Sequence, residues 1–338
     1  MTLIKSISGI RGTIGGSTGD NLTPLDVVKF ASAYGMWLKN RANGSLTVVL
    51  GRDARMSGAI VQDLVQASLL SLGINVVDLG LSTTPTVEVA VPLENANGGI
   101  ILTASHNPKQ WNALKLLNEK GEFVSAADGA EILSIAENES FDFAEVDDLG
   151  SSIKKDYLQI HIDAVLALST VDVDLVKSAK LKVVIDAVNS TGGIYIPALL
   201  TQMGVEVVEL YCEPNGKFPH NPEPLPEHLH DLCSLVKESN SDLGFVVDPD
   251  VDRLAIVSED GTLFGEEYTL VAVADHVLKT QKGDTVSNLS STRALKDVSV
   301  KHGVNYHASA VGEVNVVNKM KEVNSPIGGE GNGGIIYP

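Results

Sequence analysis

Short apolar runs alternate with longer amphipathic stretches near the start of the chain. Residues 46–51 and 74–79 are rich in Val, Leu and Ile, which predicts β-strands. Residues 58–72, between them, place apolar side chains at helical spacing, and a turn is expected at Pro85. This rhythm is typical of βαβ units, so the sequence predicts an α/β fold.

A similar sequence pattern recurs later in the chain, which indicates an internal repeat of domain size. The segments VVLGRDARMSG and LGINVVDLG within 48–80 correspond to VVIDAVNSTGG and MGVEVVELY within 183–211, and a fainter third copy spans 285–310. Each copy predicts a strand, a polar turn, a helix and a second strand. A glycine stands at each expected helix end: Gly73, Gly204 and Gly303.

The repeat predicts three tandem related α/β domains with mixed sheets. Their expected bounds are residues 1–153, 154–256 and 257–338. The acidic stretch 137–155 lacks periodicity and is predicted to be an interdomain connection, which is favoured over a role in recognition. A chain of 338 residues also exceeds what one hydrophobic core usually spans.

The net charge of the chain limits the classes of molecule that it is expected to bind. Asp and Glu number 43 against 25 Lys and Arg, a formal net charge of −18, which disfavours nucleic acid and anionic membranes. A phosphorylated substrate would meet the same repulsion and therefore requires a local cluster of Arg and Lys. Cys212 and Cys233 have neither metal nor disulfide spacing, and we find no export signal or membrane-spanning run, so a cytoplasmic protein is expected.

The first candidate for chemistry is TASHNP at 103–108, directly after the apolar run GGIIL at 98–102. A strand followed by a polar turn places Ser105 at the edge of a sheet. As a phosphoserine it would be a phosphoryl donor, and His106 and Lys115 can hold its charge or move protons. A loop without catalytic role explains these residues too, although the segment does not match the GxSxG pattern of hydrolases.

The second candidate is DPDVDR at 248–253, which has apolar strands on both sides. Asp248, Asp250 and Asp252 can converge on one hard cation such as Mg²⁺ where the backbone turns. The flanking strands argue against a merely solvated acidic turn. A calcium loop of the EF-hand type fails, because Arg253 stands at the sixth position, where that loop needs glycine, and a strand follows.

The third candidate is GGEGNGG at 328–334. Glycines let the backbone approach a ligand closely, and Glu330 and Asn332 can bond to sugar hydroxyls. Glycine-rich segments are often only turns. The nucleotide-binding form GxxxxGK[ST] is absent from it, and a nucleotide is not expected.

Candidates for the required basic cluster are Arg11 in SGIRG at 8–12, and Arg52 and Arg55 in GRDARMSG. For the last two, ordinary surface salt bridges are an equally good explanation. The three histidines within 218–230 match no zinc motif and are expected in a solvated loop.

Together these segments resemble the α-D-phosphohexomutases, the family of phosphoglucomutase, phosphomannomutase and phosphoglucosamine mutase. The order of the family's motifs is kept over essentially the whole chain: SGIRG, TASHNP, DPDVDR and the Gly-Glu sugar loop at 329–334. The resemblance implies transfer of a phosphoryl group between O1 and O6 of a hexose phosphate. A phosphoserine carries the group, and a hexose 1,6-bisphosphate is the intermediate and activator.

The resemblance also implies roles for individual residues. Ser105 would be the phosphoserine, and the Mg²⁺ ligands would be its phosphate with Asp248, Asp250 and Asp252. The residues around the transferring group would be Arg11, His106, Lys115 and Arg253. The residues that bind the sugar would be Arg253, Glu330 and Asn332, with Glu313 nearby.

The chain departs from the family pattern in its sugar loop and at its end. GEGNGG replaces the common GEMSGH and resembles archaeal-type phosphoglucosamine mutase-like members. Glu313 follows Gly312 where phosphomannomutase/phosphoglucomutase members have histidine, and an acid there favours a cationic amino sugar. The family's fourth domain has no counterpart, so a C-terminally incomplete chain is expected.

Conversion of glucosamine 6-phosphate to glucosamine 1-phosphate is therefore the expected reaction, in a monomer or homodimer. Neutral hexose phosphates, as in phosphoglucomutase and phosphomannomutase, are the alternative substrates. A phosphatase that loses the phosphoryl group to water, and a sugar-phosphate-binding module without turnover, remain the rival functions.

Overall fold

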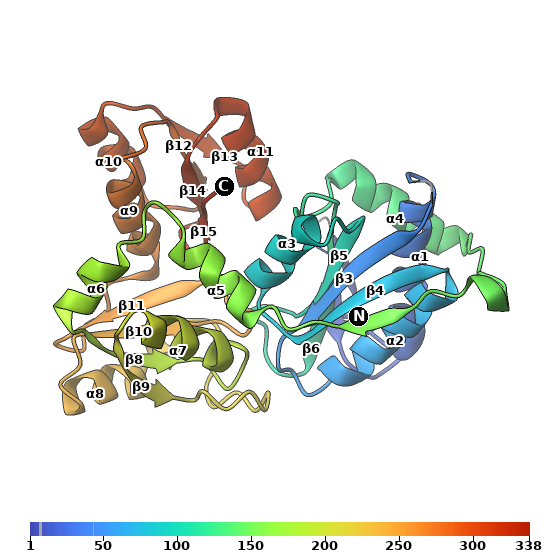
Figure 1. Cartoon of the computed structure of the whole chain (residues 1–338), viewed down its shortest axis with the longest axis horizontal. Coiled ribbons are helices and arrows are strands. Elements are labelled where there is room, and N and C mark those ends of the chain that lie inside the picture. The colour runs from blue at the N-terminus through green and yellow to red at the C-terminus, as the bar shows by residue number, and fades with distance from the viewer. Residues whose placement is uncertain (7–8, 43) are drawn as a thin grey trace. The chain divides into compact units, whose positions relative to one another are not determined.

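The computed structural model of the chain describes residues 1–6, 9–42 and 44–338. It divides into two compact units, one of Met1–His161 with Pro214–Phe218 and one of Ile162–Glu213 with Pro219–Pro338. The first unit holds one β-sheet and the second holds two (Figure 1).

The first unit is built on a mixed sheet of seven strands in the order β1-β2-β6-β5-β3-β4-β7. The strands are β1 (Ile4–Ser6), β2 (Gly9–Thr13), β3 (Leu46–Arg52), β4 (Ile74–Leu81), β5 (Gly98–Leu102), β6 (Trp111–Leu117) and β7 (Ser152–Lys154). Strands β3, β4, β5 and β7 run parallel, whereas β6 is antiparallel to both of its neighbours, β2 and β5.

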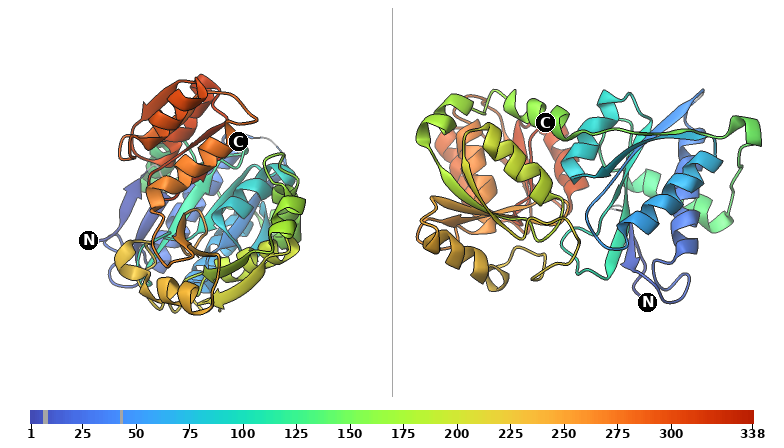
Figure 2. Two further views of the ribbon diagram at one scale, coloured as in Figure 1. Left: turned by 90° about the vertical axis from the view of Figure 1, so that its left-hand side faces the viewer. Right: turned by 60° about the horizontal axis from the view of Figure 1, so that its bottom comes forward.

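Helices cover both faces of this sheet (Figures 1 and 2). Three pack on one face, α1 (Pro24–Lys39), α2 (Gly58–Ser71) and α4 (Ala126–Asn138), and α3 (Thr84–Leu93) packs on the other. Because both faces are covered, every residue of β5 is buried. Pro85 lies in the first turn of α3, where its lack of an N–H costs nothing, so the turn expected there is the start of a helix.

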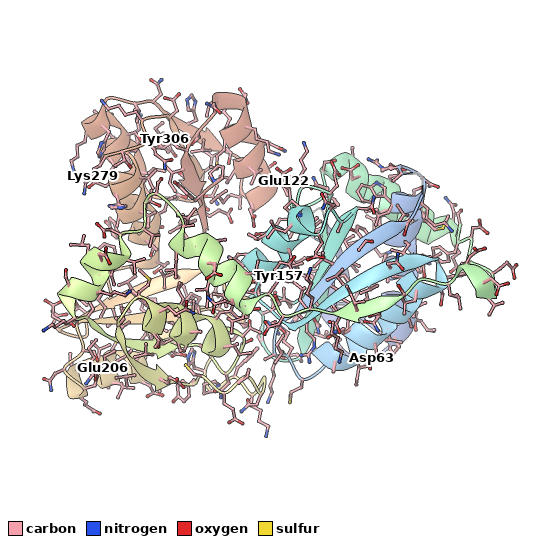
Figure 3. All side chains as sticks on the ribbon, in the orientation of Figure 1. Asp63, Glu122, Tyr157, Glu206, Lys279 and Tyr306 are labelled. Atoms are coloured by element: carbon pink, nitrogen blue, oxygen red, sulfur yellow. The ribbon has the colours of Figure 1, made fainter. Side chains whose placement is uncertain are left out.

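The acidic stretch 137–155, predicted to be an interdomain connection, contains regular structure. It ends α4, contains the short 3₁₀ turn η1 (Val146–Asp148), and finishes in β7, which pairs with β4 at the edge of the sheet. Just beyond, Tyr157 (labelled in Figure 3) donates a hydrogen bond to the carboxylate of Glu94 at the end of α3. This bond ties the end of the stretch to the first unit.

The second unit contains two mixed sheets of four strands, in the orders β11-β10-β8-β9 and β13-β12-β14-β15. The strands are β8 (Lys182–Asp186), β9 (Glu206–Leu210), β10 (Leu243–Val247), β11 (Leu254–Ser258), β12 (Thr285–Asn288), β13 (Tyr306–Ser309), β14 (Ile327–Gly329) and β15 (Ile335–Ile336). The pairs β10–β11 and β14–β15 are antiparallel and the others are parallel.

Helices again pack on both faces of each sheet. The first sheet has α8 (His230–Glu238) on one face and α7 (Gly192–Gln202) on the other. The second has α9 (Glu266–Val277) and α10 (Ala294–His302) on one face and α11 (Glu313–Val323) on the other. The remaining elements are α5 (Leu158–Leu166), α6 (Val173–Ala179) and the 3₁₀ turn η2 (Pro226–His228).

The predicted fold class, three related α/β domains with mixed sheets, is confirmed. Gly73, Gly204 and Gly303 follow α2, α7 and α10 with φ of +77°, +74° and +71°. Glycine reaches this left-handed region without steric cost, which is why it stands at the same point of each copy. The exact domain boundaries at 153 and 257 stay predictions. No helix in the described part of the chain is long and apolar enough to cross a membrane.

The glycine after α10 gives a stability prediction. A Cβ added at Gly303 would meet no atom within 4 Å, so Gly303→Ala adds backbone strain and no clash. We expect the free energy of unfolding in urea to fall by about 1 kcal/mol, and by less in Gly303→Asn, because asparagine tolerates the left-handed region better. An alanine variant as stable as wild type would contradict this account.

Candidate active site

The Ser105 loop joins β5 to β6 in the first unit. Ser105 has φ of +48°, a left-handed conformation that residues other than glycine rarely adopt. Its Oγ lies 3.3 Å from Nδ1 of His106. The structure therefore brings together the serine and the histidine singled out from the sequence, at the end of a buried strand as expected.

Arg11 and Lys115 lie on the same face of the sheet as the start of this loop. Arg11 on β2 is directly opposite Ala113 on β6, and Lys115 is two residues further along β6. Opposed residues and residues two apart share a face, so both cations do as well. Thr103, which begins the loop, bonds through its backbone N–H to the carbonyl of Ala113.

Arg11 has hydrogen-bonding capacity that the described residues do not use. Its Nε is buried and has no acceptor among them. An unused buried donor is uncommon in proteins and suits a residue that binds an anion. Ser8, the first residue of the SGIRG motif, lies outside the described residues.

The other two candidate arginines do not form a surface cluster. Arg55 is 1% exposed, and its Nε lies 2.9 Å from Oδ2 of Asp53, so the expected surface salt bridge is instead a buried one. Arg52 bonds through Nε to Gln62 and through Nη1 to the carbonyl of Asp53. The sequence showed both residues in GRDARMSG but could not show their burial.

The acidic loop in the second unit lies in the hairpin between β10 and β11. Asp248 and Asp250 are fully buried and Asp252 is partly buried, and one carboxylate oxygen from each lies within 4.8 Å of the others. Asp248 Oδ1 accepts hydrogen bonds from the backbone N–H groups of Asp252 and Arg253, each at 3.2 Å. The loop therefore curls around one of its own carboxylates, and a strand follows it as predicted.

Side chains at the start of α7 hold this loop in place. Ser190 Oγ and Thr191 Oγ1 both donate to the carbonyl of Pro249, at 2.7 and 2.9 Å. Val251 has φ of +63°, which completes the tight turn between Asp250 and Asp252. The carbonyl of Pro249 is thus satisfied by two hydroxyl groups.

The donor set of this loop fits Mg²⁺. Three carboxylates so close together repel one another strongly unless a cation lies among them. Oxygen ligands of this kind suit a hard divalent ion. Asp248, Asp250 and Asp252 form the one such cluster found in the described part of the chain, which includes no histidine or cysteine cluster suited to zinc.

The histidine loop has a local role of its own. His220 Nε2 lies 2.9 Å from Oδ2 of the buried Asp186, at the end of β8. Burial alone would lower the pKa of His220, but the hydrogen bond and the charge of Asp186 outweigh it, so the net pKa is raised. His220 is therefore an ion-pair partner rather than the fully solvated side chain that was expected.

The sugar loop lies between β14 and β15. Glu330 Oε1 accepts hydrogen bonds from Asn288 Nδ2 and from the backbone N–H of Gly312, at 2.5 and 3.0 Å. Its Oε2 lies 3.5 Å from Nδ2 of Asn332. One oxygen of Glu330 is thus held by the protein, and the bond to Gly312 places the start of α11, which is Glu313, next to this loop.

The sugar loop and the acidic loop adjoin each other within the second unit. The backbone N–H of Leu254, just after Arg253, donates to the carbonyl of Gly333 at 3.1 Å. A pocket opens beside this contact. Its lining residues are Glu223, Pro224, Leu225, Arg253, Glu266, Ser290, Gly331 and Asn332. The structure thus brings Arg253 and Asn332 into one pocket, without Glu330 or Glu313 in its lining.

Two acids of this pocket, Glu223 and Glu266, were missed by the sequence analysis. Glu223 comes from the histidine-containing loop and Glu266 opens α9 after Gly265, which has φ of +95°. Neither lies in a recognisable motif. Only the packing of separate segments shows that they face the same space.

Comparison with known proteins decides the family. The chain matches the models of phosphoglucomutase/phosphomannomutase α/β/α domains I, II and III over residues 3–143, 159–261 and 265–338. A phosphoglucomutase/phosphomannomutase of Thermococcus kodakarensis is 34% identical over 331 residues, covering 97% of this chain and 72% of that protein. The chain belongs to the phosphohexomutase family.

Further relatives agree with this assignment. A probable phosphoglucosamine mutase of Methanopyrus kandleri is 32% identical over 334 residues, covering 98% of this chain and 71% of that protein. The crystal structure of a putative phosphomannomutase from Thermus thermophilus superposes with a TM-score of 0.88 at 25% identity, covering all of this chain and 76% of that one. The phosphohexomutase is an isomerase of a magnesium-dependent family, as its motifs predicted.

The carboxylate cluster gives a prediction about metal binding. Asp250→Asn removes one of three negative charges, so we expect affinity for Mg²⁺, measured by calorimetry, to fall by about ten-fold or more. Asp260→Asn is the matched control, because Asp260 is an exposed aspartate at the other end of β11. Equal Mg²⁺ affinity in both variants would show that this carboxylate cluster is not the metal site.

Proposed function

We propose that this phosphohexomutase interconverts glucosamine 6-phosphate and glucosamine 1-phosphate, with Ser105 as its phosphorylated residue. The pocket of the second unit is the observation that carries the choice of substrate. It combines one arginine, Arg253, with two carboxylates, Glu223 and Glu266. Arg253 suits a phosphate, and the acids favour a sugar that carries an ammonium group.

The first half of the reaction uses the phosphoserine. A free hydroxyl of the hexose monophosphate attacks phosphorus, a new P–O bond forms to the sugar, and the P–O bond to Ser105 breaks. The hydroxyl proton passes to His106 and then to the departing serine oxygen. The product of this half is a hexose 1,6-bisphosphate and a free Ser105 hydroxyl, so atoms and charge balance.

The second half runs in the opposite direction on the other phosphate. The bisphosphate turns, Ser105 attacks the second phosphorus, and the isomeric monophosphate leaves. Arg11 and Lys115 hold the charge of the phosphoryl group, since positioning and charge neutralisation supply most of the catalysis in phosphoryl transfer. Asp248, Asp250 and Asp252 would hold a Mg²⁺ ion, which would supply further neutralisation of charge.

Recognition of the sugar falls to the loop between β14 and β15. Glu330 Oε2 accepts a long hydrogen bond from Asn332 Nδ2, at 3.5 Å, so the two side chains lie together and can bond to neighbouring hydroxyls of a sugar. Glu313 adds a negative charge close to this loop through the contact of Gly312 with Glu330. Several relatives are named probable phosphoglucosamine mutases, which supports the amino sugar.

Neutral hexose phosphates are the second candidate substrates. The relative from Thermococcus kodakarensis, at 34% identity, is named phosphoglucomutase/phosphomannomutase. A single pocket can accept both classes with different kcat/KM, so the ratio between them is the quantity to measure.

The role of Ser105 is tested by intact mass. Wild type incubated with glucose 1,6-bisphosphate should gain one phosphate, and Ser105→Ala should gain none. Ser71→Ala is the control and should behave as wild type, because Ser71 Oγ donates to the carbonyl of Ala67 within the same helix, α2. Phosphate uptake by the Ser105→Ala variant would show that another residue is the acceptor.

The role of Glu313 is tested by substrate preference. Glu313→His should shift the ratio of kcat/KM for glucosamine 6-phosphate over glucose 6-phosphate by about ten-fold toward glucose, because one favourable charge interaction is lost. Glu322→His, on the exposed side of the same helix, should leave the ratio unchanged. If the two variants shift the ratio equally, Glu313 does not select the substrate.

A further inference from the structure

The backbone of Ser105 is held from both sides by buried side chains. Its N–H donates to Thr103 Oγ1 at 3.0 Å, and its carbonyl accepts from Arg55 Nη2 at 2.5 Å. These two bonds lie on either side of the Ser105 Cα atom. They therefore act directly on the left-handed conformation in which Ser105 is found, with φ of +48°.

Every N–H group of the Arg55 guanidinium donates a hydrogen bond, either to a backbone carbonyl in or next to this loop or to the carboxylate of Asp53. Nε donates to Asp53, and each terminal nitrogen donates to two backbone carbonyls. The four carbonyls belong to Ser105 and Asn107 for Nη2, at 2.5 and 2.6 Å, and to Pro108 and Trp111 for Nη1, at 2.8 and 3.0 Å. Five donors in the rigid fork of arginine thus meet five acceptors.

Asp53 joins the two ends of this arrangement. Its Oδ2 accepts from Arg55 Nε at 2.9 Å and from Thr103 Oγ1 at 2.7 Å. Its Oδ1 accepts from the backbone N–H of Arg55 at 2.9 Å. Asp53 and Thr103 are fully buried, so the bonds have little competition from water.

The charge of Arg55 is neutralised where it stands. Asp53 pairs with it, and the ring of Phe218 packs over the guanidinium with its centre 5.1 Å from Cζ. Phe218 belongs to the segment Pro214–Phe218 that joins the first unit, where Gly216 also packs against the carbonyl of Ala54. A guanidinium that is paired, covered and fully bonded acts through geometry rather than as a phosphate-binding charge.

We propose that Asp53, Arg55 and Thr103 form a positioning unit for phosphoryl transfer, which holds Ser105 in its left-handed conformation with Oγ beside His106. The inference rests on the proposed role of Ser105. A non-glycine residue leaves this backbone region readily unless its surroundings determine it, and here both of its backbone groups are fixed. Loss of the unit would let the loop relax and move the reacting oxygen.

Four variants separate the geometry of the positioning unit from its charge and from the stability of the fold. Arg55→Lys keeps the positive charge but replaces five forked donors by three on a flexible stem, so it should lose the function. Thr103→Val keeps the shape but removes both hydroxyl bonds, whereas Thr103→Ser keeps the hydroxyl. Tyr34→Phe is the stability control, since the buried Tyr34 hydroxyl donates to the carbonyl of Leu117 at 2.7 Å, away from the loop.

The experiment measures the rate at which Ser105 takes up phosphate from glucose 1,6-bisphosphate, by intact mass, together with kcat and KM for the monophosphate. All variants are assayed well below their unfolding temperatures. Arg55→Lys and Thr103→Val should be phosphorylated about 100-fold more slowly than wild type, with kcat reduced and KM little changed. Thr103→Ser and Tyr34→Phe should remain near the wild-type rate.

The experiment distinguishes a wrong role for Ser105 from a wrong role for the positioning unit. If wild type takes up no phosphate, or Ser105→Ala takes it up, the proposed role of Ser105 is wrong. If wild type is phosphorylated on Ser105 and Thr103→Val matches its rate, the positioning role is overturned, even where Arg55→Lys does not fold. An equal loss of rate in Tyr34→Phe also overturns it, because general destabilisation then explains the effect.

Discussion

The burial of the central strands is the constraint on which the rest of this structure depends. Helices cover both faces of each sheet, so a strand such as β5 has no exposed side chain and no place for polar chemistry along its length. Polar residues are accommodated where the strands end. The Ser105 loop follows β5, the acidic loop follows β10 and the sugar loop follows β14. The three candidate loops thus occupy equivalent positions in three related domains.

Loops at such positions must satisfy their own backbone groups, and this chain does so with buried side chains. Arg55 bonds to the carbonyls of the Ser105 loop, and Ser190 and Thr191 bond to the carbonyl of Pro249 in the acidic loop. In the sugar loop the roles are reversed, because the carboxylate of Glu330 accepts from the backbone of Gly312. Each loop therefore has a defined shape before any ligand binds, which lowers the cost of ordering it during catalysis.

The net charge of the chain and the charges at the candidate sites have different effects. A net charge of −18 repels a sugar phosphate at long range, so the proposed binding of a phosphate depends on individual cations. Arg11 has a buried Nε without an acceptor among the described residues, and Arg253 lines the pocket of the second unit. In the proposed function the acids of the chain contribute as well, as ligands for a cation and as partners for an ammonium group. That proposal therefore depends on the local arrangement of charges and not on the total charge.

The sequence by itself determined the fold class, the repeat and the three loops. These features are local patterns: apolar periodicity, the helix-end glycines and the motifs TASHNP, DPDVDR and GGEGNGG. Local patterns can be recognised without knowledge of long-range contacts. It misjudged Pro85, because a proline that starts a helix and one in a turn look alike, and it did not indicate β7 within 137–155, because a short edge strand has no strong pattern. Only the tertiary structure decided that Arg55 is buried beneath the Ser105 loop and that Glu223 and Glu266 share a pocket with Arg253. Those facts depend on which segments, far apart along the chain, pack together, and burial turns a residue that could be a surface charge into one that must be fully hydrogen-bonded.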